Sequence, residues 1–140
     1  MPEYDRLEIR RAVTLEGLRD AEPVVVWRAP QSGPMSQLIW APELHEIDGK
    51  WYIYFAATHT HDLDALGMFQ HRMFVLECAD SDPLTGRWQE KAVVTPFDTF
   101  ALDATTFTHQ GKRWYLWAQN PRISKATQTC ISPKWLTRGR

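Results

Sequence analysis

Residues 39–57, with the sequence IWAPELHEIDGKWYIYFAA, decide the fold of this chain. Asp48-Gly49 is a dipeptide that tolerates positive φ in a tight turn, and apolar and aromatic residues lie on both sides of it. The stretch therefore predicts a β-hairpin. The run from Trp51 to Phe55 shows no alternation with polar residues, so we expect this strand to be buried on both faces.

The same hairpin recurs as residues 101–119, ALDATTFTHQGKRWYLWAQ. Gly49 and Gly111 are 62 residues apart, and the segments GKWYIYFA and GKRWYLWA that follow them match in kind if Arg113 is taken as an insertion. A repeat at this spacing indicates stacked supersecondary units, because a single unit cannot bury its own faces.

A second kind of hairpin, the outer hairpin, alternates with these inner hairpins. It combines a strand with one polar face, a turn containing glycine or proline, and a second apolar strand. The expected segments are 7–12, 14–18 and 23–27, then 72–78, 82–88 and 92–94, and a third, shorter version that opens at 127–132.

The resulting unit of four antiparallel strands, repeated along the chain, predicts an all-β fold built from β-propeller blades. A β-sandwich is the main alternative. The repeat favours the propeller, with residues 1–140 holding the outer half of one blade, one full blade and most of the next. Such an incomplete ring would leave apolar sheet faces uncovered, so we expect a truncated gene product that exposes them or self-associates.

The composition excludes several classes of protein. The 140 residues are 44% hydrophobic and 24% charged with a net charge of -1, which indicates a globular domain without a surface for nucleic acid. We expect no membrane partner, since no apolar run is long enough to cross a bilayer. Cys78 and Cys130 are too far apart in sequence for a zinc motif and are expected to be small core residues.

The histidines give only a weak metal signal. His59, His61 and Asp62 form the best local cluster, but they lie in a long polar loop, residues 58–70, that we expect near the channel opening or an adjacent surface. Histidines in such a loop are more often solvated than metal-bound, so we predict no metal site.

Two carboxylates lie at the mouths of the inner hairpins. Asp103 is surrounded by apolar residues, which makes it either a structural acceptor or an active-site group. Glu43 follows Pro42, which restricts the local backbone; Glu43 either caps a turn or pairs with a base such as Arg72, or belongs to a site. Trp40 is either a core residue or a platform for a sugar ring.

The repeat relates these two mouths. The offset of 62 places position 41 opposite Asp103, so the mouths are equivalent on adjacent blades and should face the same axis. We therefore expect Asp103 to point inward, away from bulk water, into a pocket that it shares with Trp40 and Glu43.

The motifs LIWAPELHEIDGKWYIYFAA, HRMFVLE with DPLTGRW, and FALDATTFTHQGKRWYLWAQ resemble glycoside hydrolase family 43, in particular its α-L-arabinofuranosidase-like members. The resemblance covers nearly the whole chain. It implies a five-bladed β-propeller that hydrolyses arabinose- or xylose-containing polysaccharides with inversion. It implies no cofactor and leaves open whether an ion occupies the channel of the intact protein.

The family works with three carboxylates, and Asp103 in ALDATTF matches the one that tunes the pKa of the general acid and orients it. By resemblance the general base lies upstream of this chain and the general acid beyond Arg140, whereas Glu43 matches the acidic position of WAPE, which is not the acid. Trp40, Glu43 and Thr105 are the expected substrate-binding residues. The chain alone is therefore expected to be inactive; the alternative is a carbohydrate-binding or structural β-module that self-associates.

Overall fold

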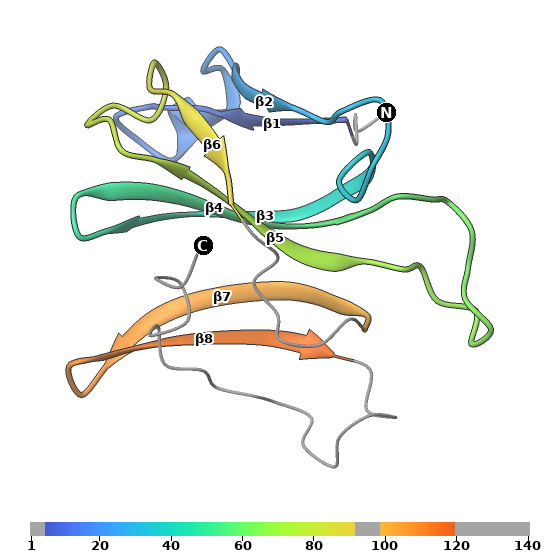
Figure 1. The fold of residues 1–140 in the computed structure, drawn as a ribbon. Coiled ribbons are helices and arrows are strands. Elements are labelled where there is room, and N and C mark those ends of the chain that lie inside the picture. Colours follow the sequence, from blue (N-terminus) through green and yellow to red (C-terminus); the bar gives the residue numbers. More distant parts are fainter. Residues whose placement is uncertain (1–4, 92–98, 120–140) are drawn as a thin grey trace.

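The computed structural model describes residues 5–91 and 99–119, and it is built almost entirely from antiparallel strands (Figure 1). The strands form a two-stranded sheet β1-β2, a four-stranded sheet β3-β4-β5-β6 and a two-stranded sheet β7-β8. The elements are β1 (Arg6–Ile9), the 3₁₀ helix η1 (Glu16–Arg19), β2 (Val24–Arg28), β3 (Gln37–Ile47), β4 (Lys50–Thr58), β5 (Arg72–Cys78), β6 (Trp88–Glu90), β7 (Ala101–His109) and β8 (Lys112–Gln119).

Both predicted inner hairpins are confirmed, and their turns have the same backbone. Asp48 and Gly49 have φ of 51° and 76°, and Gln110 and Gly111 have φ of 49° and 70°. Two consecutive residues with positive φ are the mark of the type I′ turn, whose twist matches that of the flanking strands. The Asp48-Gly49 dipeptide supplies this conformation at little steric cost, which explains why β3 turns into β4 at this point.

The repeat is more regular than the sequence alone suggested. Ile47 pairs with Lys50 in the first hairpin and His109 with Lys112 in the second. The pairs Glu46–Trp51 and Thr108–Arg113 keep the same offset of 62. Arg113 therefore occupies the position of Trp51, and its interpretation as an insertion is wrong.

Strand β4 is buried on both faces, as the sequence predicted. Phe55 is 0% exposed and packs with Leu7 and Phe74 in a cluster that faces β1-β2. Tyr54 is 1% exposed and packs with Trp117 in a second cluster, on the side of β7-β8. The four-stranded sheet is therefore the middle one of three layers, as Figure 1 shows.

This middle sheet is the expected blade of four antiparallel strands, and the all-β class is confirmed. Strand β6 begins at Trp88, which the sequence placed at the end of a turn. The strand predicted at residues 92–94 and the third outer hairpin predicted from residue 127 lie outside the described residues. In the described ranges, no helix is long and apolar enough to span a membrane.

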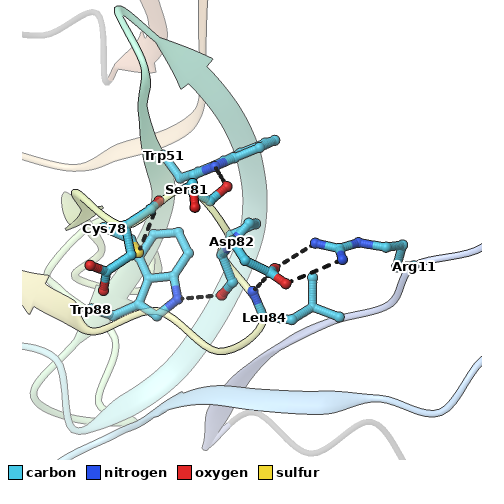
Figure 2. A network of polar contacts seen from close by, with 9 residues as sticks. Arg11, Trp51, Cys78, Ser81, Asp82, Leu84 and Trp88 are labelled. Carbon is cyan, nitrogen blue, oxygen red and sulfur yellow. Dashed lines mark hydrogen bonds and ion pairs between the residues drawn. The ribbon is translucent and has the colours of Figure 1, made fainter.

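Two polar contacts connect the first sheet to the outer edge of the blade. Nη2 and Nη1 of Arg11 lie 2.5 and 3.3 Å from the two carboxylate oxygens of Asp82, an arrangement with two parallel N–H donors (Figure 2). Nε1 of Trp27 donates to Oε1 of Glu90 at 2.8 Å. The loop after β1 and the strand β2 are thus both held against the β5-β6 hairpin.

The turn between β5 and β6 is closed by its own side chains. Asp82 also accepts a hydrogen bond from the backbone N–H of Leu84 at 3.0 Å, and the indole of Trp88 donates to the carbonyl of Pro83 at 2.9 Å (Figure 2). Cys78 is fully buried beneath this turn, as expected of a core residue, and Cys130 lies outside the described residues.

Gly86 generates the first prediction. A Cβ at this position would overlap Sγ of Cys78 and lie 2.8 Å from the carbonyl oxygen of Asp82. We expect Gly86→Ala to lower the free energy of unfolding by about 1–3 kcal/mol, because an added methyl group in a packed turn must displace its neighbours. Denaturant unfolding would measure this change.

The Cys78→Ala background is the control for that substitution. Removing Sγ takes away one of the two overlaps, so Gly86→Ala should cost less in Cys78→Ala than in the wild type. Equal costs in the two backgrounds would show that the sulfur is not the obstacle.

A second prediction concerns association in solution. Several large apolar side chains of the described part are exposed, and Val13 and Leu15 are the most exposed of them. We expect the chain to self-associate or to bind an apolar dye, because exposed apolar surface favours association. Sedimentation velocity with dye titration would measure both, and a monodisperse monomer without dye binding would contradict the expectation.

Candidate functional site

The candidate site is built on two equivalent β-bulges. In β3, Trp40 pairs with Ala56 and Glu43 with Tyr54, so three steps along β3 oppose two along β4. In β7, Leu102 and Thr105 bracket the same irregularity at the same offset of 62. The extra residue bends each strand and redirects the side chains at the bulge.

The residues within the two bulges have left-handed backbone conformations. Ala41 has φ of 47° and Asp103 has φ of 52°. Neither is glycine, so each position stores conformational strain of about 1–3 kcal/mol, and such strain is concentrated at functional sites. The predicted equivalence of positions 41 and 103 is therefore visible in the backbone itself.

Trp40 is a packing residue that is only partly buried. It packs against the cluster that contains Tyr54 and Trp117. The centroid of the His71 ring lies 4.2 Å away in a stacked arrangement, and Phe69 meets the indole edge-on at 5.3 Å. The residue as a whole is partly buried, and its Nε1 is buried.

Glu43 lies on the accessible side of the same bulge. Its Oε2 is 2.9 Å from Nε2 of His45, and its side chain is 46% exposed. The basic neighbour with which it pairs is thus His45, whereas Nη1 of Arg72 donates to the carbonyls of Gln70 and His71.

A buried tyrosine connects this bulge to the next sheet. The hydroxyl of Tyr115 on β8 is buried and has no hydrogen-bond partner among the described residues. Burial raises the pKa of Tyr115 above its ordinary value, and the neighbouring Tyr54 and Glu43 raise it further. Glu43 therefore lies close to the interface between the two inner hairpins.

Asp103 differs from its expected environment. It lies on β7 in the bulge but is exposed to solvent, so the expectation that it is held away from bulk water is wrong for the described structure. Thr105, at the end of the bulge, is half-buried. Strands β3 and β7 are in contact, and Trp40 and Leu102 pack against the same apolar cluster, so the two mouths are neighbours.

The loop predicted at residues 58–70 begins after Thr58, which ends β4, and its last residues reach the site. Leu63 and Phe69 form an isolated antiparallel bridge, and the carboxylate of Asp64 accepts hydrogen bonds from the backbone of Leu66 and Met68. Phe69 then contacts Trp40. The loop thus lies beside the candidate site, on a surface adjacent to it.

The histidines separate into two kinds. Nε2 of His61 lies 2.8 Å from Oε1 of Gln37, and His59 is exposed. His71, in contrast, is fully buried and stacks beneath Trp40. Within residues 5–91 and 99–119, no three His, Cys, Asp or Glu side chains gather in a group that could hold a metal ion.

Comparison with known proteins identifies the family. The family model of glycosyl hydrolases family 43 matches residues 1–137. The chain belongs to glycosyl hydrolase family 43. Its antiparallel four-stranded sheet and the flanking sheets are accordingly parts of the five-bladed propeller that the sequence motifs implied.

The relatives of this family 43 chain are arabinofuranosidases. It is 52% identical over 120 residues to an extracellular exo-α-(1→5)-L-arabinofuranosidase of Streptomyces chartreusis, covering 85% of the chain and 35% of the relative. It is 45% identical over 145 residues to α-L-arabinofuranosidase 43 of Humicola insolens, covering 99% of the chain and 29% of that protein.

A solved structure agrees with these relatives. The crystal structure of an α-L-arabinofuranosidase from Lactobacillus brevis superposes with a TM-score of 0.83 at 54% identity, over 91% of this chain and 41% of that one. The family 43 chain thus spans about a third of the curated relatives named here.

The buried histidine generates a prediction about pH. Burial lowers the pKa of His71 below its ordinary value of 6.5, against a smaller opposing effect of the hydrogen bond to Leu38. Between pH 6.5 and the lowered pKa, His71 binds a proton in the unfolded chain but not in the native chain. The free energy of unfolding should therefore fall as the pH falls from 6.5 toward the lowered pKa.

Denaturant unfolding between about pH 7.5 and 5 would measure this slope, which is at most about 1.4 kcal/mol per pH unit for one proton. His71→Phe should remove the contribution of His71 to the pH dependence of the free energy of unfolding. His109→Gln, at the exposed end of β7, is the control and should leave this contribution in place. An unchanged slope in His71→Phe would contradict the assignment.

Proposed function

We propose that this chain forms part of the sugar pocket of an inverting, arabinofuranosidase-like glycoside hydrolase that acts on arabinose- or xylose-containing polysaccharides. The observation that carries the proposal is the pair of strained bulges at positions 41 and 103, which brings the WAPE segment and Asp103 to neighbouring inner strands. The arabinofuranosidase relatives support the same substrate class.

In this proposal each residue has a separate role. Trp40 offers the accessible part of its indole to the apolar face of a sugar ring, and Glu43 and Thr105 flank it with polar atoms that can accept or donate hydrogen bonds. Asp103 acts on a second carboxylic acid. Because a nearby negative charge disfavours ionisation, an ionised Asp103 raises the pKa of a neighbouring general acid and keeps it protonated.

Asp103 alone is not sufficient for hydrolysis with inversion. That reaction requires one acid to protonate the leaving oxygen and one base to activate water on the opposite face, with the two carboxyl groups about 6.5–9.5 Å apart. The resemblance assigns Asp103 to neither role. We therefore propose that the 140-residue chain binds the sugar but does not turn it over.

Binding of an arabino-oligosaccharide tests the pocket. We expect Trp40→Ala to raise the dissociation constant about tenfold in calorimetry, because a lost aromatic contact of about 1.4 kcal/mol corresponds to that factor. Trp51→Phe is the matched control, since Trp51 lies on β4 and donates to the carbonyl of Ser81 in the outer turn. Equal losses in both variants would contradict a pocket at Trp40.

Hydrolysis of an aryl α-L-arabinofuranoside tests the rest of the proposal. The purified chain should release no aryl alcohol above background, because one carboxylate cannot act as both acid and base. Turnover at a rate that Asp103→Asn abolishes would show that the catalytic set is complete within these 140 residues.

A non-catalytic module that associates through its sheets is the second candidate, and the exposed apolar side chains favour it. The two functions separate in one comparison. A module would bind the oligosaccharide only in its associated form, whereas a pocket between the two inner hairpins would bind at concentrations where the chain is monomeric.

A further inference from the structure

His71 is a fully buried titratable group that the proposed chemistry does not use. It precedes β5, and its Nε2 lies 3.0 Å from the carbonyl oxygen of Leu38. A carbonyl oxygen can only accept, so Nε2 carries the hydrogen. Nδ1 is also buried and has no hydrogen-bond partner among the described residues. Burial lowers the pKa of the ring, in agreement with a neutral imidazole.

The carbonyl that His71 holds belongs to a strained residue. Leu38 has φ of 49°, and the pairing of β3 with β4 shifts between Gln37 and Trp40 as well as between Trp40 and Glu43. Trp40 therefore lies between two irregularities of the same strand. Strained backbone persists only where surrounding contacts fix it, and the hydrogen bond from His71 is such a contact.

The same imidazole also fixes the ring of Trp40. The two ring centroids are 4.2 Å apart with an interplanar angle of 28°, so one face of the indole rests on His71. Phe69 meets both rings edge-on, at 5.3 Å from Trp40 and 6.0 Å from His71. A single side chain thus contacts both the backbone that carries Trp40 and the plane of its indole.

We propose that His71 is a positioning residue for the sugar platform: it orients Trp40 through the hydrogen bond to Leu38 and through ring stacking. The inference rests on the proposed function of Trp40. It assigns His71 no contact with the sugar and no part in proton transfer. Its two functions, donor and stacking ring, can be removed one at a time.

The test uses the full 140-residue chain and two substitutions. His71→Phe keeps an aromatic ring and removes the donor, and His71→Gln keeps an N–H donor and removes the ring. His109→Gln, in the exposed end of β7, is the matched control. Calorimetry with an arabino-oligosaccharide gives the dissociation constant, at a temperature where thermal unfolding shows each variant to be folded.

We expect both His71 variants to bind about tenfold more weakly than the wild type. In a Trp40→Ala background they should have no further effect, because the platform is already absent. A structural role alone would lower the melting temperature and leave the dissociation constant of the folded chain unchanged. Wild-type affinity in either folded variant would therefore overturn the proposal.

Magnetic resonance of the wild type provides a measurement that needs neither variant nor ligand. Long-range proton–nitrogen correlation should show His71 as the Nε2–H tautomer, and Trp40→Phe should shift its ring protons. The Nδ1–H tautomer, or unshifted ring protons, would overturn the positioning. If the wild type does not bind the oligosaccharide, the proposed function is refuted. The spectrum is recorded without ligand, so it tests the positioning of Trp40 by His71 separately.

Discussion

The burial of both faces of β4 is the constraint on which the rest of the structure depends. Successive side chains of a strand point to opposite faces, so Tyr54 and Phe55 must each find a separate apolar layer. One layer is supplied by β1-β2 and the other by β7-β8. An isolated hairpin could not satisfy this requirement, and the stacking of sheets follows from it. The middle of β4 is taken up by packing on both faces. The polar groups of the candidate site are therefore carried by the bulged segment of β3, which pairs with β4.

The sequence predicted the elements that local chemistry determines. Asp48-Gly49 and the second turn at Gly111 revealed both inner hairpins, because few residues adopt positive φ easily. The offset of 62 then related the hairpins. An alignment of the aromatic residues alone suggests an insertion at Arg113, whereas pairing in the sheet places Arg113 opposite Thr108. The sequence placed Trp88 at the end of a turn. Its indole does close the turn, by donating to the carbonyl of Pro83, but the same residue also begins β6.

Sequence motifs predict the residues of the candidate site and the repeat relates its two mouths, but the backbone conformation of the bulges could not be predicted. Trp40, Glu43 and Asp103 came from motifs, which carry no information on backbone dihedral angles. The left-handed conformation at Ala41 and the exposure of Asp103 depend on how two strands fall out of register, which is a tertiary property. His71 was missed because it lies at the boundary between a polar loop and a strand, where a histidine looks solvated. Only its place beneath Trp40 distinguishes it.

The two bulges share a backbone conformation but carry different side chains. Their backbones agree at positions 41 and 103, yet one carries a methyl group and the other a carboxylate. The extra residue of a bulge is left unpaired in the ladder, so its side chain can differ while the strand pairing on either side stays the same. The two described inner hairpins thus share one bulge geometry. Codons for alanine and aspartate can differ by a single nucleotide, so one mutation can place an ionisable group at such a position.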